Sequence, residues 1–132
     1  MTAPTRTGRT AGEGTLILVV DDDPRMRRVI RWALEDEGLH VETAMDGQEA
    51  LDVARKHPPS LAVLDITLPV MHSYDVAPAL RAVTSEALPI LAISADGHIE
   101  EKAQRVGAFA YVRKPFEMSE FLAAVRQGLD GR

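Results

Sequence analysis

The stretch "TLILVVDDDP" at residues 15–24 joins an uncharged apolar run to three consecutive aspartates and a proline. A continuous apolar run of this length is typical of a strand buried on both faces of a parallel sheet. Aspartate is a poor strand residue, and proline is favoured at the first position of a helix. The stretch therefore predicts a buried strand followed directly by a helix, with three carboxylates between them.

The same alternation continues along the rest of the chain. Four further apolar runs predict strands at 40–44, 61–66, 88–94 and 108–113. Helical spacing of apolar residues predicts helices at 24–37, 47–56, 75–84, 98–106 and 117–129. Because proline is disruptive beyond the first turn of a helix, Pro78 places the start of the third helix no earlier than about Asp75. Five β-α units in order predict a single-domain α/β fold, a doubly wound parallel sheet with helices on both faces.

The composition is that of one soluble globular domain. The 132 residues are 45% hydrophobic and 27% charged, which is ordinary for a folded protein. The net charge of −5 argues against direct binding of nucleic acid, because such surfaces are usually basic. No apolar run is long enough to span a membrane. Cysteine is absent, which excludes a thiolate metal site and agrees with a reducing, cytoplasmic location.

The folded domain is expected to cover residues 15–130. Residues 1–14, "MTAPTRTGRTAGEG", lack the apolar segment of a secretory signal and have low hydrophobicity. A disordered N-terminal tail is the expected structure of this segment, although its two arginines and scattered threonines also suggest a transit peptide.

Polar side chains converge where the predicted strands end. In an open parallel sheet, ligands bind at the carboxyl ends of the strands. Grouped carboxylates suit Mg²⁺, a lysine beside them can pair with a phosphoryl group or a carboxylate, and a carboxylate can be the nucleophile that forms an aspartyl phosphate. The sequence therefore predicts a Mg²⁺ site with phosphate chemistry at this edge. The residues concerned are Asp21, Asp22 and Asp23 after the first strand, Asp65 in the third, Ser94 in the fourth and Lys114 after the fifth.

Asp23 differs from its two neighbours because Pro24 follows it directly. A residue before a proline at the first helical position occupies the N-cap, where an aspartate accepts from free backbone N–H groups and complements the helix dipole. We therefore expect Asp23 to cap the helix that follows.

Four segments together resemble the signature segments of the receiver domain of two-component response regulators. They are "ILVVDDDPRMRRVI", "LAVLDITLPVM", "ILAISA" and "YVRKPF", in the family's order and spacing. The resemblance implies a flavodoxin-like, CheY-like fold with strand order 2-1-3-4-5. It also implies a bacterial signalling phosphoprotein that catalyses its own phosphotransfer and dephosphorylation and is not a metabolic enzyme.

The resemblance gives the carboxylates individual roles. Asp65 would accept a phosphoryl group from a partner histidine. Asp22 would bind Mg²⁺ directly, together with Asp65 and the backbone carbonyl of Thr67, while Asp21 would contribute largely through water. Thr67 replaces an amide or acidic residue of many relatives, so the rate of autodephosphorylation is the property that this residue is expected to change.

The resemblance also gives roles to residues on the last two strands. Ser94 would hydrogen-bond a phosphoryl oxygen, and Lys114 would pair with the phosphoryl group or, before phosphorylation, with the carboxylates. The bond from Lys114 to Pro115 is often cis in this family, as only bonds to proline readily are. Tyr111 matches the aromatic residue that turns inward as the Ser94 hydroxyl moves; a core or half-buried strand aromatic is the alternative.

Two surface features and one loop have alternative explanations. The arginines of the predicted helix 24–37 form a solvated face or part of a docking surface for kinases, and Trp32 among them is a partner contact or a partly buried edge residue. His72 and Ser73 replace a polar residue and a glycine of the family, so strain or a different loop path is expected before the third helix. The segment of the fourth helix, 96–107, is about two residues shorter than the family pattern, which is expected to alter the face that it forms with the fifth strand and the last helix.

The implied partners are proteins: a sensor histidine kinase or histidine phosphotransfer protein, and a downstream target. A second copy is a further possible partner, in a homodimer through the face of the fourth helix, the fifth strand and the last helix. No contact with nucleic acid or membrane is expected, and the histidines lie at no metal-ligand spacing. The competing functions are a pseudo-receiver without phosphotransfer and the receiver part of a longer regulator; a stand-alone protein is favoured because no output domain follows. A phosphatase of the haloacid-dehalogenase type is disfavoured, because Thr67 takes the place of its second acid.

Overall fold

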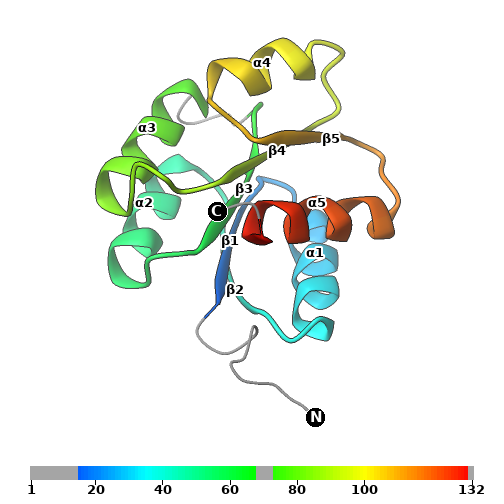
Figure 1. Ribbon diagram of the computed structural model, residues 1–132, viewed down its shortest axis with the longest axis horizontal. Coiled ribbons are helices and arrows are strands. Elements are labelled where there is room, and N and C mark those ends of the chain that lie inside the picture. The colour runs from blue at the N-terminus through cyan, green and yellow to red at the C-terminus, as the bar shows by residue number, and fades with distance from the viewer. Residues whose placement is uncertain (1–14, 68–72, 131–132) are drawn as a thin grey trace.

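Five strands and five helices alternate along the part of the chain that the computed structural model describes, residues 15–67 and 73–130 (Figure 1). The strands are β1 (Leu16–Val20), β2 (His40–Ala44), β3 (Leu61–Asp65), β4 (Ile90–Ser94) and β5 (Ala110–Arg113). The helices are α1 (Pro24–Asp36), α2 (Gly47–Lys56), α3 (Ser73–Val83), α4 (Ile99–Arg105) and α5 (Met118–Asp130). The predicted order of elements is confirmed, and the tail expected at 1–14 lies outside the described residues.

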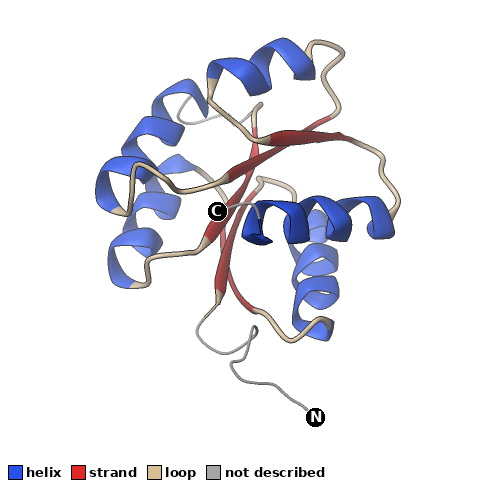
Figure 2. Ribbon diagram, in the orientation of Figure 1, coloured by secondary structure: helices blue, strands red, loops and turns tan. Residues whose placement is uncertain are grey.

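All five strands run parallel in one sheet, in the order β2-β1-β3-β4-β5. Figure 2 shows helices on both faces of this sheet: α1 and α5 cover one, and α2, α3 and α4 cover the other. The predicted doubly wound α/β fold with strand order 2-1-3-4-5 is therefore confirmed. The order of the strands reverses between β1 and β3, which makes the carboxyl ends of these two strands the topological switch point.

Alternate residues of β1 belong to two separate cores. Ile17 and Val19 pack with residues of α1 and α5, whereas Leu18 and Val20 pack with residues of α2, α3 and α4. All four side chains are fully buried. A strand covered on both faces has no exposed position for a polar side chain, which explains its uninterrupted apolar sequence. The first polar residues come where the strand ends.

α1 begins as the sequence predicts. Pro24 is its first residue, and Asp23 has an extended backbone at the N-cap position. The Asp23 Oδ1 accepts a hydrogen bond of 2.9 Å from the Arg25 backbone N–H. The prediction that Asp23 caps this helix is therefore confirmed.

α3 begins earlier than the sequence predicts. The helix runs over Ser73–Val83 and contains Pro78, whereas the expected start was near Asp75. Pro78 lies on the exposed side of the helix and removes one backbone hydrogen bond, while Val76 and Leu80 on the other side are fully buried. Burial of this apolar face offsets the missing bond, so the proline does not end the helix.

The loop before α3 was expected to be strained or to take a different path. Ser73 is the first residue of α3, so its backbone is helical and the strain of a positive φ does not arise at this position. His72 lies outside the described residues.

The described helices are short. The longest, α1 and α5, have 13 residues each, and no helix in the described ranges combines the length and the apolar composition needed to cross a membrane. α4 has seven residues, fewer than the expected range 98–106.

Candidate functional site

Three carboxylates gather at the switch point of the sheet. Asp21 follows β1 and Asp65 ends β3, and the pairing of Val20 with Leu64 sets these two aspartates side by side. Together with Asp22, they place one carboxylate oxygen each within 4.8 Å of the others. The side chains of Asp21 and Asp65 are buried, and Asp22 is exposed. The predicted convergence of these three residues is therefore present in the structure.

Lys114 directly follows the edge strand β5, and its side chain reaches this cluster. Its Nζ donates to Asp21 Oδ2 at 2.8 Å and to Asp65 Oδ2 at 3.0 Å. The backbone anchors the residue at the edge of the sheet, because the Lys114 N–H donates to the carbonyl of Ser94 at 2.9 Å. The bond from Lys114 to Pro115 is cis, as the resemblance implies.

Burial and hydrogen bonding shift the pKa values of Asp21 and Lys114. Burial raises the pKa of the Asp21 carboxyl above its ordinary value, although hydrogen bonds from Lys114 and from the Asp23 N–H oppose this shift. Burial alone lowers the pKa of Lys114, but its hydrogen bonds to Asp21 and Asp65 outweigh that effect and raise the pKa above the ordinary value. Lys114 is therefore charged at neutral pH, and one ammonium faces three acidic groups.

The donor set fits Mg²⁺. Three carboxylates close together supply hard oxygen ligands, and the exposed side chain of Asp22 leaves the site open to a hydrated ion. One ammonium cannot balance three carboxylates, so a cation at this position relieves repulsion between them. Among the described residues, Asp21, Asp22 and Asp65 would hold such an ion; the Thr67 carbonyl stays a predicted further ligand.

Asparagine in place of Asp21 is expected to stabilise the protein when metal is removed by a chelator. The pKa of Asp21 is raised on folding, so the folded state binds this proton more tightly than the unfolded state does. The ionised carboxylate therefore lowers the free energy of unfolding at pH values above its folded pKa. Urea unfolding at neutral pH should show a higher free energy for Asp21→Asn than for the wild type. The difference should shrink as the pH falls and the wild-type carboxyl takes up its proton; a less stable variant at neutral pH contradicts the expectation.

Thr67 contacts Asp65 more closely than the sequence indicates. Its backbone N–H donates to Asp65 Oδ1 at 2.9 Å, and its hydroxyl donates to the same oxygen at 2.7 Å. The first bond is the ordinary hydrogen bond of an aspartate to the backbone two residues later. The second depends on a hydroxyl at position 67. Both oxygens of Asp65 are thus engaged, Oδ1 by Thr67 and Oδ2 by Lys114.

Arg27 is a second contact that the sequence does not reveal. Its guanidinium donates to the Asp21 carbonyl at 2.7 Å, from one turn into α1. The only signal in the sequence is a basic residue four positions after the N-cap, and that spacing alone does not distinguish it from the other arginines of α1.

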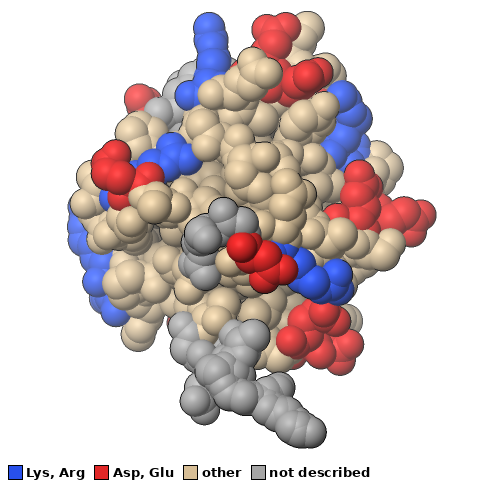
Figure 3. Space-filling view, in the orientation of Figure 1, with Lys and Arg blue, Asp and Glu red and all other residues tan. Residues whose placement is uncertain are grey.

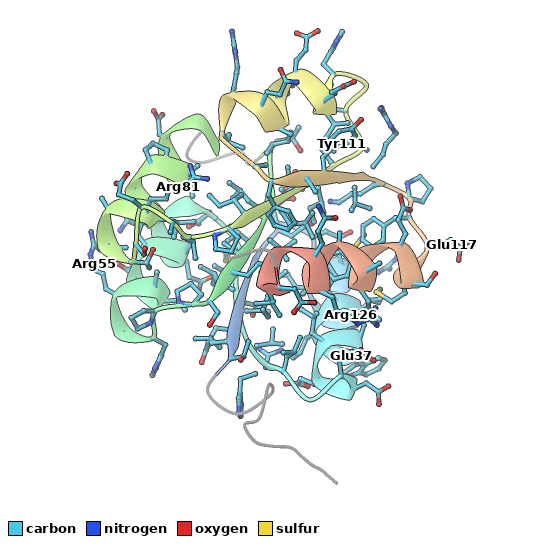
Figure 4. The ribbon with its side chains drawn as sticks, in the orientation of Figure 1. Glu37, Arg55, Arg81, Tyr111, Glu117 and Arg126 are labelled. Carbon is cyan, nitrogen blue, oxygen red and sulfur yellow. The ribbon has the colours of Figure 1, made fainter. Side chains whose placement is uncertain are left out.

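Ser94 at the end of β4 and Tyr111 on β5 belong to the two strands that follow β3 in the sheet. Ser94 is fully buried, and its Oγ accepts from the Asp96 N–H at 3.0 Å, so among the described contacts it does not bond to Asp65. Tyr111 is 39% exposed and lies next to α4, where it lines a shallow groove with Glu100 and Gln104 (Figure 4). Tyr111 is therefore not a core residue, and its role as a switch stays a prediction.

Comparisons with known proteins agree with this arrangement. A family model described as the response regulator receiver domain matches residues 17–126. The chain is similar to the transcriptional regulatory protein KdpE of Mycobacterium tuberculosis, with 41% identity over 112 residues that cover 85% of this chain and 50% of KdpE. It is also similar in structure to the chemotaxis protein CheY4 of Vibrio cholerae, with a TM-score of 0.80, 30% identity, and coverage of 87% of this chain and 98% of that one.

The receiver domain of NtrX from Brucella abortus gives a similar result, with a TM-score of 0.81, 31% identity, and coverage of 88% of this chain and 99% of that chain. The chain spans about half the length of the curated relatives that it matches. The matched range, 17–126, includes all three clustered carboxylates and the lysine between them. Fold, site and sequence therefore agree that the chain belongs to the family of response regulator receiver domains.

Proposed function

We propose that this domain accepts a phosphoryl group on Asp65 from a phosphohistidine of a partner protein, in a Mg²⁺-dependent reaction. The partner is a sensor histidine kinase or a histidine phosphotransfer protein. The observation that carries the proposal is the position of Asp65, buried at the end of β3 with the Lys114 Nζ 3.0 Å from its Oδ2 and two further acids beside it. On this proposal the protein is a phosphoacceptor and not a metabolic enzyme.

The proposed step is an in-line transfer. A carboxylate oxygen of Asp65 forms a bond to phosphorus while the bond from phosphorus to the histidine nitrogen breaks, and the imidazole leaves with that electron pair. Bound Mg²⁺ supplies charge neutralisation, which is most of what phosphoryl transfer needs. Lys114 holds its charge beside the acceptor and can follow the phosphoryl oxygens. The Ser94 hydroxyl accepts from the Asp96 N–H, which leaves its own proton available for donation to a phosphoryl oxygen.

The signal then passes to a protein target. A small change at Ser94 can bias a bistable surface, and exposed Tyr111 lies on β5 next to the helix that follows Ser94. We propose α4, β5 and α5 as the surface that changes, either for a target or for a homodimer. A cytoplasmic location follows from the proposed partners.

Two alternatives stand beside this proposal. A pseudo-receiver would keep the fold and the carboxylates without phosphotransfer. The receiver part of a longer regulator is supported by the match to only half of KdpE, whose name is that of a transcriptional regulatory protein. The full reading frame of the gene decides the second alternative.

Incubation with Mg²⁺ and acetyl phosphate tests the proposal. The intact mass should rise by one phosphoryl group, because a small phosphodonor can replace the kinase when the domain itself supplies the catalytic groups. An excess of chelator should prevent the gain. No gain with a saturating donor and Mg²⁺ supports the pseudo-receiver instead.

Asp22→Asn is expected to weaken Mg²⁺ binding by more than about tenfold, or 1.4 kcal/mol. The side chain of Asp22 is the exposed carboxylate of the cluster and is therefore the direct ligand open to an incoming ion. Asp23→Asn is the matched control, because it removes the same charge from the next residue while asparagine still caps the helix. Calorimetric titration with Mg²⁺ measures both; equal losses of affinity contradict the division of the three aspartates into ligands and a cap.

A further inference from the structure

The outward side of α1 carries an exposed stripe that the proposed phosphotransfer does not use. Opposite it, Ile30 and Leu34 are buried against the sheet. Every member of the stripe is exposed, and we call this set the α1 stripe: Arg25, Arg28, Val29, Trp32, Glu35 and Asp36.

Two large apolar side chains stand at the middle of the α1 stripe. Trp32 is 66% exposed and Val29 is 46% exposed. They are three residues apart, so they lie on the same side of the helix. The other large apolar side chains that are exposed in the described ranges lie singly elsewhere: Met45 in the loop after β2 and Tyr111 on β5. An apolar pair of this kind on a helix surface is a sign of an interface.

The charges of the α1 stripe are separated along the helix. Arg25 and Arg28 lie in its first half, while Glu35 and Asp36 lie in its last turn. A helix dipole favours the opposite order, with acids at the start and bases at the end. Figure 3 shows the acidic side chains gathered over the C-terminal end of α1. The separation therefore does not serve the stability of the helix itself.

Most of these charges also have no partner among the residues that the structure describes. In the described ranges, the side chains of Arg25, Arg28 and Asp36 take part in no hydrogen bond or ion pair. Glu35 makes a loose contact of 3.5 Å with Arg31. Glu37, just beyond the helix, is different, because it pairs with Arg126 of α5 at 3.1 Å (Figure 4).

We propose that the α1 stripe binds the same stripe of a second copy of this chain, in an antiparallel, two-fold symmetric pair. Arg28 lies four residues before Trp32, and Glu35 and Asp36 lie three and four residues after it. With the two helices crossing at Trp32, Arg28 of each copy therefore faces the acidic end of the other. Arg25, one turn further out, extends the same pairing. A surface that is complementary to itself is what a two-fold dimer requires.

The apolar centre has a place for the tryptophan of the second copy. Trp32 itself is part of the lining of a wide, shallow depression of about 710 Å³, with Glu35 and Asp36 as its polar members. The apolar members of the lining besides Trp32 are Val29 and Ala33 of α1 and Met118 at the start of α5. Trp32 of each copy packs on this apolar lining of the other, so each contact occurs twice. One helix face per copy is a small interface, so the dimer is weak and forms in the micromolar to millimolar range. This inference does not rest on the proposed phosphotransfer.

Sedimentation equilibrium of the full chain over that concentration range tests the proposal. The wild type should approach dimer mass as concentration rises. Two charge-reversed variants, Arg25→Glu/Arg28→Glu and Glu35→Lys/Asp36→Lys, should each weaken self-association at least tenfold, because each stripe then carries one sign of charge. Both variants follow the preference of the helix dipole, so they should fold.

Mixed in equal amounts, the two charge-reversed variants should form a heterodimer at least as tight as the wild-type dimer. Trp32→Ala should also dissociate, and Met45→Ala should behave as the wild type.

Three results overturn the proposal. The first is a wild type that stays monomeric throughout the range, which leaves the stripe for a different protein. The second is a dimer that survives both charge reversals and Trp32→Ala. The third is a dimer that Tyr111→Ala dissociates, which places the interface on α4, β5 and α5 instead.

Discussion

Asparagine in place of Asp65 is expected to abolish phosphorylation by acetyl phosphate. An amide oxygen is a far weaker nucleophile than a carboxylate, while the side chain keeps its size at a fully packed position. The single amide oxygen can accept from Thr67 or from Lys114 but not from both, so one of these contacts is lost while the isosteric side chain keeps the packing of the fold. Intact mass after incubation with Mg²⁺ and donor measures the result.

The control for Asp65→Asn is Asp23→Asn. It removes one carboxylate from the same end of the sheet, but at the helix cap and outside the cluster, so it should be phosphorylated as the wild type is. A melting curve for each variant shows whether loss of phosphorylation reflects unfolding. Phosphorylation of Asp65→Asn at the wild-type rate would place the acceptor elsewhere.

Alanine in place of Lys114 is expected to cost up to about 3–5 kcal/mol of stability in metal-free protein, because it leaves two carboxylates buried without their counter-ion. The side chains of Asp21 and Asp65 are 0% and 4% exposed, so both carboxylates depend on the ammonium rather than on bulk water for their compensation. Denaturant unfolding measures the loss. Added Mg²⁺ should recover part of it, since the ion binds the folded state.

The pH dependence of folding stability tests the same role of Lys114 independently. The pKa of Lys114 is raised on folding, so its contribution to stability is fully present below its ordinary pKa of 10.5 and is lost as the pH rises through the higher folded value. Lys114→Ala should lack this alkaline loss. Lys56→Ala, at the exposed end of α2, is the control and should change stability by less than about 0.5 kcal/mol. A loss in Lys114→Ala no larger than in Lys56→Ala contradicts the role given to the ammonium.

The central strands are the part of the fold that local sequence predicts best. β1 and β3 are covered by helices on both faces, so each reads as an unbroken apolar run that ends at an aspartate. The convergence of Asp21, Asp22 and Asp65 follows from these strand ends, because parallel neighbours bring their carboxyl ends to one edge.

α3 shows where a local rule fails. Pro78 predicts a later start for the helix, since its ring removes a backbone bond. Buried Val76, on the opposite side from the proline, belongs to the core under α2, and that packing depends on residues distant in sequence. A prediction from residues that are neighbours in the sequence cannot include this packing.

Two contacts of the site also lie beyond prediction from sequence. The hydroxyl of Thr67 bonds to Asp65 and the guanidinium of Arg27 bonds to the carbonyl of Asp21, and each depends on a side-chain rotamer set by the surrounding packing. Tyr111 is a related case. β5 is an edge strand with one face toward α5 and an exposed position at 111, and its short sequence fits a buried and an exposed aromatic equally well.

The chemical location of the phosphoryl group tests the central claim most directly, because Asp65→Asn removes a proposed Mg²⁺ ligand together with the proposed acceptor. Borohydride reduces an aspartyl phosphate to an alcohol and so marks the residue that carried it. Trypsin separates the candidates, with Asp65 in the peptide 57–81 and the three consecutive aspartates in 10–25. Mass spectrometry of the reduced peptides should place the mark on Asp65 alone. A mark on Asp21, Asp22 or Asp23, or on no residue of a protein saturated with donor and Mg²⁺, would contradict the account.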